Sequence, residues 1–340
     1  MRVRLGIFAA LVMACSFDAS GSGSDDAGST GSTTGSTAGT GTSPPTSGPT
    51  SGPTSGPTSG PTTADTGSSD DATTGPVVYG PFDTPVALTE LNSDGTDDDP
   101  SLRGDLLEAY FGSTRAGTED LWRATRASAT DPFDAPELVE SLNVTDADET
   151  TPELSSDGLT LMFSSSRAGG LGDLDMYVTS RASLDDDWGE PVAIPELSSA
   201  FGEGAAVFTE DALLAVFCRG QMRGHAAIFR GTRASDRAPW EVERIDALDT
   251  PFSDCSPWIT ADGSELWFAS DRDGGAGGND VWLVPMDGGA PGRPEPVVEL
   301  NTDVEDDDPW LSPDGSTIVF ASDRDEAGDI DLYIAVRTAM

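Results

Sequence analysis

Residues 309-PWLSPDGSTIVFASDRDEAGDIDLY-333 carry the clearest structural signal in the chain, because most of this stretch occurs more than once. A second copy, 257-PWITADGSELWFASDRDGGAGGNDVW-282, lies upstream. Each copy has a DG pair, then a short apolar run with alternating side chains, then a polar loop containing glycine. Alternation of this kind predicts β-strands, and the DG pair predicts a tight turn because glycine tolerates positive φ. Each copy is therefore expected to be a set of consecutive β-hairpins.

The copies belong to a longer series marked by one phenylalanine that recurs about 52 residues apart. Its five occurrences are Phe111, Phe163, Phe217, Phe268 and Phe320. A second aromatic follows each of them on the next predicted strand, at Trp122, Tyr177, Phe229, Trp282 and Tyr333. A period of this length, with four short strands in each copy, is typical of the blade of a β-propeller. We predict an all-β fold of five four-stranded blades, with six blades as the alternative, and expect these ten aromatic side chains to be buried.

The repeat resembles that of TolB-type, WD40-like (PD40-type) β-propellers, over about residues 80–340. This resemblance implies the propeller fold but no particular activity, because propellers serve binding, scaffolding and catalysis alike. The predicted propeller covers residues 78–340, with repeats at about 82–130, 131–183, 184–235, 236–288 and 289–340. Residues 85–91 are expected to pair antiparallel with residues 331–337 and so to close the ring.

The segment before the propeller has the features of an exported, lipid-anchored protein. Residues 1–14 read as a lipoprotein signal peptide, with a basic start and an apolar run too short to cross a bilayer. Val12-Met13-Ala14-Cys15 resembles a bacterial lipobox, which makes Cys15 the expected lipidation site; an ordinary cleaved signal is the alternative. Ser16 does not match an inner-membrane retention signal, which favours the outer membrane. Residues 15–77 are rich in Ser, Gly, Thr and Pro, a composition that predicts a disordered tether.

The charge of the chain limits its partners. It has 18 basic residues, all of them arginine, against 60 acidic ones, and a formal net charge of −42. Nucleic acid and anionic lipid headgroups would be repelled, so contact with a membrane is expected through the lipid anchor only. Protein, peptide or glycan partners remain, and the expected location is the cell envelope.

Acidic and basic residues also follow the repeat. Three residues before the repeated proline lies an acid, and four residues after the repeated phenylalanine lies an arginine. The acids are Asp97, Glu149, Asp254 and Asp306, and the arginines are Arg115, Arg167, Arg272 and Arg324. We expect these residues to form ion pairs between blades and so to fix the geometry of the ring. A cation-binding ring of acids, or simply solvated loops, are the alternatives.

The third repeat departs from the pattern. It keeps an acid, Glu203, but has Gln221 at the arginine position, so Glu203 is expected to lack its symmetric partner. Only the off-register Arg219 or Arg223 remains to meet it, which would leave lone pairs of the carboxylate free for a cation or a basic ligand. Arg223 and His225, the only histidine, lie in the same loop. We therefore assign Glu203, Gln221, Arg223 and His225 as the candidate binding residues; simple divergence of this repeat is the alternative.

Cysteine and glycine patterns leave two further questions open. Cys218 and Cys255 fall near the same face of neighbouring repeats, so they form either a disulfide or two separate buried thiols. The loops 169-GGLGDLD-175 and 274-GGAGGND-280 nearly match a calcium-binding nonapeptide, with Asp271 and Asp273 close by. The other interpretation is that Asp175 and Asp280 cap the backbone amides of their own loops. No cofactor is expected, with calcium as the alternative.

Two functions are compatible with these features. A non-catalytic propeller that binds a protein, peptide or glycan is favoured, because a single histidine and the absence of a nucleophile motif argue against hydrolase triads. The alternative is a carbohydrate-active propeller enzyme that uses carboxylates at the channel mouth, since glycoside hydrolysis needs only two carboxyl groups.

Overall fold

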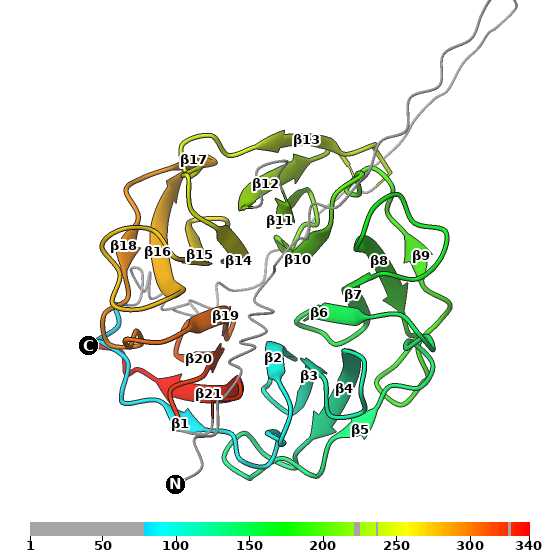
Figure 1. Cartoon of the computed structure of the whole chain (residues 1–340), viewed down its shortest axis with the longest axis horizontal. Helices are drawn as coiled ribbons and strands as arrows, with labels where there is room; N and C mark the ends of the chain where they lie inside the picture. Colours follow the sequence, from blue (N-terminus) through cyan, green and yellow to red (C-terminus); the bar gives the residue numbers. More distant parts are fainter. Residues whose placement is uncertain (1–77, 221–224, 236, 326–327) are drawn as a thin grey trace, which may run out of the picture. The chain divides into compact units, whose positions relative to one another are not determined.

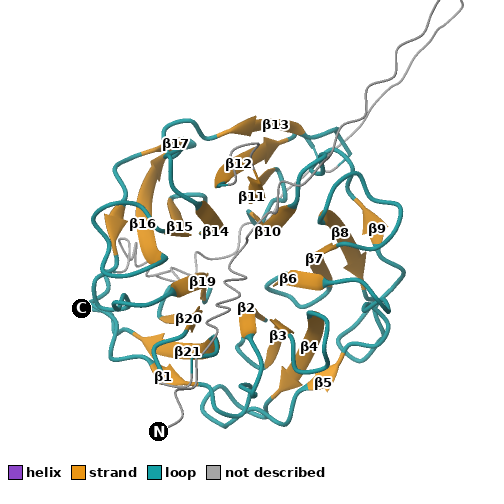
Figure 2. Cartoon of the chain, in the orientation of Figure 1, coloured by secondary structure: helices purple, strands orange, loops and turns teal. Residues whose placement is uncertain are grey.

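Five β-sheets stand around a central channel, each formed mainly from one copy of the repeat (Figure 1). The computed structural model describes residues 78–220, 225–235, 237–325 and 328–340. The expected signal peptide, Cys15 and tether therefore lie outside the described residues. Strands and loops make up the described part, which contains no helix long and apolar enough to cross a membrane (Figure 2). The predicted five-bladed propeller is confirmed.

Each blade runs from an innermost strand at the channel to an outer strand at the rim. The innermost strands are β2 (Asp97–Leu102), β6 (Glu149–Leu154), β10 (Glu203–Phe208), β14 (Asp254–Ile259) and β19 (Asp306–Leu311). The second strands are β3 (Glu108–Ser113), β7 (Thr160–Ser165), β11 (Leu214–Gly220), β15 (Glu265–Ser270) and β20 (Thr317–Ser322). The third strands are β4 (Asp120–Thr125), β8 (Asp175–Ser180), β12 (Ala226–Thr232), β16 (Asp280–Asp287) and β21 (Asp331–Val336). We number the blades 1 to 5 in this order.

The outer strands are shorter than the sequence suggested. They are β5 (Glu137–Leu138), β9 (Val192–Ala193), β13 (Glu241–Arg244), β18 (Glu295–Pro296) and, in blade 5, β1 (Val86–Ala87). Blade 4 has an extra short strand, β17 (Ala290–Pro291), which also pairs with β16. Four of the five outer strands contain or adjoin a proline, which cannot donate a ladder hydrogen bond, so pairing at the rim is limited to a few residues.

The ring closes as predicted, because the first described strand completes the last blade. Val86 pairs with Ile334 and Ala87 with Tyr333, both antiparallel. The Leu88 amide then donates to the Leu332 carbonyl at 2.8 Å. This pairing gives β21 a partner on its outer side, which leaves blade 5 with four strands like the others.

The core consists of the repeated aromatics packed between and within blades. All five repeated phenylalanines are buried, each at most 1% exposed. Of their partners on the third strands, Tyr177, Trp282 and Tyr333 are buried, whereas Trp122 and Phe229 are half-buried. The prediction of a repeated aromatic core is thus confirmed for eight of the ten side chains, and the remaining two are partly covered.

Candidate functional site

The repeated acids begin the innermost strands and are fully buried. Each one meets an arginine of its own blade, which corrects the expectation of ion pairs between blades. The pairs are Asp97–Arg115, Glu149–Arg167, Glu203–Arg219, Asp254–Arg272 and Asp306–Arg324. The reason is the pairing register, which places each acid opposite the residue two positions after the repeated phenylalanine; this residue lies two positions before the arginine in four blades and is the arginine itself in blade 3.

The same arginines also connect neighbouring blades. In blade 2, Arg167 Nη2 donates to Glu149 at 3.2 Å and to the Leu142 carbonyl at 2.7 Å, in the loop that leaves the outer strand of blade 1. The guanidinium lies over the rings of Phe163 and Tyr177, with centroid distances of 5.1 and 4.8 Å. Every blade repeats this arrangement. Its contacts are with the protein itself, which indicates a structural role for the acid and arginine set.

Blade 3 obtains its arginine from a different sequence position. Arg219 stands where the other blades have serine, directly opposite Glu203, and its Nε donates to Glu203 Oε1 at 2.6 Å. The Ser199 amide donates to the other carboxylate oxygen at 2.9 Å. Glu203 thus pairs with the off-register Arg219, and both of its oxygens accept hydrogen bonds, so the expectation that it is available to a ligand is wrong. Gln221 and Arg223 lie outside the described residues, and His225 is half-buried just before β12.

Cys218 and Cys255 form a disulfide that links β11 of blade 3 to β14 of blade 4. Their Cα atoms are 5.0 Å apart, and both side chains are buried. The bond lies at a junction between blades, which identifies it as a structural connection.

The Gly-rich loops are organised by their own aspartates. Asp175 Oδ2 accepts hydrogen bonds from the Leu171 and Gly172 amides at 2.8 and 3.3 Å, and Asp280 Oδ2 accepts the equivalent pair in blade 4. A Cβ atom at Gly170 would lie 1.8 Å from Asp175 Oδ2, so the glycine is needed for this turn. These contacts match the capping interpretation of the two loops.

The channel contains a feature that sequence patterns did not reveal. The third residue of each innermost strand has φ near +50°, although none of the five is glycine. They are Asp99, Thr151, Ala205, Ser256 and Asp308. The ladder shifts register here in every blade, as in a β-bulge, and a bulge re-aims the side chains of its strand. Because Ala205 shares this conformation, the bulge belongs to the blade, and only the side chain it presents differs.

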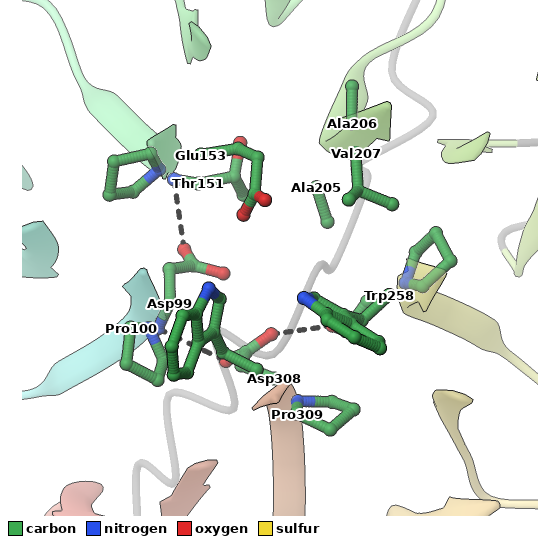
Figure 3. Close-up of a pocket in the computed structure, with 14 residues that line it drawn as sticks. Asp99, Pro100, Thr151, Glu153, Ala205, Ala206, Val207, Trp258, Asp308 and Pro309 are labelled. Atoms are coloured by element: carbon green, nitrogen blue, oxygen red, sulfur yellow. Dashed lines mark hydrogen bonds between the residues drawn. The ribbon is translucent and has the colours of Figure 1, made fainter. Parts of the chain in front are cut away.

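The bulges surround a small cavity of about 40 Å³ in the channel (Figure 3). Three carboxyl groups line it, from Asp99, Glu153 and Asp308, together with the indoles of Trp258 and Trp310. None of the described residues around the cavity is basic. Such a space admits a few water molecules or one small cationic group. The sequence does contain a pattern that marks this site. Only repeats 1 and 5 contain the string DDDP, at 97–100 and 306–309, and its third aspartate is the residue that lines the cavity.

Carboxyl groups packed this closely resist ionisation. Burial, followed by repulsion from Glu119, raises the pKa of Asp99 to about 7. Burial and the charge of Asp99 hold the pKa of Asp308 well above its usual range. Burial raises the pKa of Glu153 to about 8, although it accepts a hydrogen bond from Ser101 Oγ at 3.1 Å. A positive charge in the channel would reverse these shifts.

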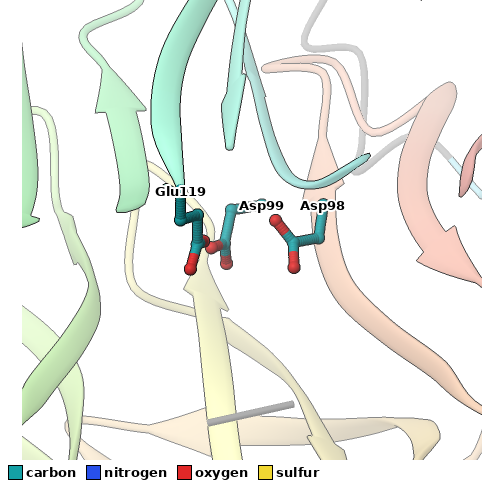
Figure 4. A group of neighbouring side chains, drawn as sticks. All are labelled: Asp98, Asp99 and Glu119. Carbon is teal, nitrogen blue, oxygen red and sulfur yellow. The ribbon is translucent and has the colours of Figure 1, made fainter. Parts of the chain in front are cut away.

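A second acidic group adjoins the cavity in blade 1. Asp98, Asp99 and Glu119 each place an oxygen within 4.8 Å of the others (Figure 4). Asp98 and Asp99 come from β2, and Glu119 from the loop before β4. Burial raises the pKa of Glu119 to about 7. Burial and the nearby charge of Glu119 raise the pKa of Asp98 well above its usual range.

Comparison with known proteins bears on the fold. No protein-family model matches the chain, and no curated protein sequence is significantly similar to it. Among solved structures, the endo-arabinase of Bacteroides thetaiotaomicron VPI-5482 is 13% identical with a TM-score of 0.51, over 76% of this chain and 97% of that chain. The α-L-arabinofuranosidase of Lactobacillus brevis is 14% identical with a TM-score of 0.50, over 74% and 94%.

TolB from Acinetobacter baumannii is also similar, at 17% identity and a TM-score of 0.48. The match covers 73% of this chain but 56% of that TolB, so the chain spans little more than half of its length. At such identities the similarity concerns the fold alone. This chain is a β-propeller, and both TolB proteins and glycoside hydrolases are among the solved propellers similar to it.

Proposed function

We propose that the protein is a lipid-anchored component of the cell envelope whose propeller binds a partner without catalysis. The partner presents a cationic group, such as a lysine side chain or a chain terminus, to the channel. The observation that carries this proposal is the cavity lined by Asp99, Glu153 and Asp308 beside two tryptophans. Carboxylates provide charge complementarity, and an indole face adds cation–π attraction. The lipobox-like segment ending at Cys15 supports the lipid anchor. Ser16 does not match an inner-membrane retention signal, which supports the outer membrane as the location of the anchor.

The carbohydrate-active alternative fits this site less well. Retaining glycosidases hold their two carboxyl groups about 5–5.5 Å apart. Inverting glycosidases hold them about 6.5–9.5 Å apart, because a water molecule must fit beside the sugar. Here the Asp99 amide donates to Asp308 Oδ2 at 3.4 Å, so these two residues pack directly against each other and leave little space for a sugar between their carboxyl groups. The cavity of about 40 Å³ is also well below the roughly 300–1,000 Å³ that small-molecule sites provide.

Calorimetry with a panel of short peptides tests this proposal. The panel carries lysine, arginine or acetyl-lysine at one position, and arabinan oligosaccharides form a separate arm with a reducing-sugar assay. We expect the cationic peptides to bind, acetylation to abolish binding, and D99N/D308N to weaken it at least tenfold.

The double variant E137Q/E241Q replaces the same number of carboxyl groups by amides on exposed outer strands and is the matched control. Equal weakening by both double variants would mean that only overall charge attracts the peptides. Binding or cleavage of oligosaccharides without peptide binding would favour the enzyme instead.

A further inference from the structure

Blade 1 contains a buried carboxylate oxygen with no hydrogen-bond partner among the described residues, close to side chains at its junction with blade 2. Asp98 is 7% exposed, and its Oδ1 atom is buried and unpaired among the described residues. An orphaned polar atom of this kind costs free energy unless something absent from the chain satisfies it. Figure 4 shows Asp99 between Glu119 and Asp98, and Asp98 Oδ1 and Glu119 Oε1 both lie close to Gly112.

The other junctions show why Asp98 lacks a partner. At four of the junctions, the residue before the third strand accepts a hydrogen bond on its carbonyl from the first amide of the next innermost strand. Between blades 4 and 5 that residue is Asn279, whose Nδ2 donates to Asp307 at 2.7 Å. Asp307 occupies the position equivalent to Asp98. Between blades 5 and 1 the residue is Ile330, which has no donor to offer.

We propose that Asp98, Asp99 and Glu119 bind a calcium ion. Their oxygens lie within 4.8 Å of one another, and ligands on opposite sides of Ca²⁺ are separated by about 4.6–5.2 Å, twice the Ca–O distance. All three are hard oxygen donors, which suit Ca²⁺ and disfavour the transition metals that prefer nitrogen or sulfur. Mg²⁺ needs a tighter octahedron at about 2.0–2.1 Å, so it fits this spacing less well.

The surroundings leave room for an ion and help to orient its ligands. Gly112 stands beside the group, where a Cβ atom would lie 2.8 Å from Asp98 Oδ1 and 3.0 Å from Glu119 Oε1. The Thr150 hydroxyl contacts both Asp99, at 2.6 Å, and Glu119. A hydroxyl has one hydrogen and cannot donate to both at once, so one of these contacts is free to rearrange around a cation. Three carboxylates and one hydroxyl thus surround the same space.

This site differs from the calcium sites that the sequence suggested. The repeated acids are engaged by arginines, and the Gly-rich loops are held by Asp175 and Asp280. Asp98 and Glu119 belong to neither set. The site shares Asp99 with the central cavity, but Asp98 and Glu119 do not line that cavity, so D98N tests the calcium site without changing a residue of the proposed partner site.

Calorimetric titration of CaCl₂ into the full chain, after treatment with a chelator, tests the proposal. Titration should extend to millimolar concentrations, since calcium sites of extracellular modules bind at about 10⁻⁴–10⁻³ M. We expect one site, weaker binding of Mg²⁺, and at least a tenfold loss of affinity in D98N. The matched control is D307N, the equivalent position whose oxygens accept from Asn279 and the Asp308 amide, and it should keep the wild-type affinity.

A second variant, G112A, fills the space without changing charge and should also lose binding. Thermal melts without calcium show whether D98N and G112A fold. Equal calcium affinity of wild type and D98N would overturn the site. Equal losses of affinity in D98N and D307N would also overturn it, because the effect would then come from overall charge. If D98N fails to fold, G112A decides, and unchanged calcium binding in that variant would overturn the proposal.

Discussion

Glu153 combines a channel position with a single hydrogen-bond donor, Ser101, and its burial raises the pKa from 4.5 to about 8. Between these pH values the folded protein holds a proton that the unfolded chain has released. The stability associated with this group is therefore complete below about pH 4.5 and is lost as pH rises through about 8.

The variant E153Q removes this dependence because the amide stays neutral. We expect E153Q to be more stable than wild type by roughly 2–4 kcal/mol at pH 8.5, with the difference shrinking toward zero near pH 4.5. Urea unfolding at pH 5, 7 and 8.5 measures this, with the exposed E137Q as control. A difference that is constant with pH would show that Glu153 is ionised in the folded state.

Arg324 shows how many contacts one repeated arginine makes with its own blade and with the neighbouring blade. Its Nη2 donates to Asp306 and to the Leu300 carbonyl, its Nε donates to Ser322, and its guanidinium lies 4.7 Å from the Phe320 centroid. R324A would leave Asp306 buried without its counter-charge. We expect a loss of about 3–5 kcal/mol in unfolding free energy.

Chemical denaturation of R324A and of R293A, an exposed arginine between β17 and β18, provides the comparison. A loss below about 1 kcal/mol in R324A would place this pair with weak surface ion pairs. R324K separates charge from geometry, since lysine keeps the charge but lacks the planar fork and should recover only part of the loss.

At the scale of elements, the seam between β1 and β21 is the point where distant parts of the chain complete one blade. Removing residues 78–94 would expose the outer edge of β21 and uncover Tyr333 and Leu332. We expect this truncated protein to melt at least 5 °C below the full chain. It should also aggregate more readily, because the unpaired amide and carbonyl groups of an exposed strand edge can pair with another chain.

Differential scanning calorimetry and light scattering measure both effects. An equal melting temperature would mean that closure contributes nothing to stability. A truncation that removes only residues 16–70 retains β1 and is the control.

Sequence patterns predicted the properties that repeat. Blade number, ring closure and the buried phenylalanines each follow from a local pattern present in all five copies. For blade 3 the sequence left Arg219 and Arg223 as alternatives, because the choice of Arg219 depends on the register of two strands, which places it directly opposite Glu203. The channel carboxylates were missed for a similar reason. Simple alternation cannot show where a bulge re-aims Asp99 and Asp308, and both residues are exceptions within the repeat.

At the scale of the whole molecule, one covalent bond joins neighbouring blades. The Cys218–Cys255 disulfide closes a loop of 37 residues between blades 3 and 4. Constraining the unfolded chain in this way should contribute about 2–4 kcal/mol. We expect C218S/C255S to unfold at correspondingly lower denaturant concentration while keeping the wild-type circular dichroism spectrum.

Wild type in the presence of a reductant should approach the double variant. If the reductant leaves the unfolding midpoint of wild type unchanged and thiol titration finds both cysteines free, the bond is absent in solution. The double variant itself should be insensitive to reductant, which controls for other effects of the reagent.

The two ends of the folded domain are held together: the Met340 amide donates to the Val78 carbonyl at 2.8 Å, and Tyr79 bridges to Ala339. Mechanical load that arrives through the chain preceding Val78 therefore reaches the propeller at its seam. Tension would peel a two-residue strand from its neighbour before it strained any of the longer inner ladders. If Cys15 is lipidated as proposed, force on the anchor is expected to open blade 5 at this seam before it disrupts the other four blades.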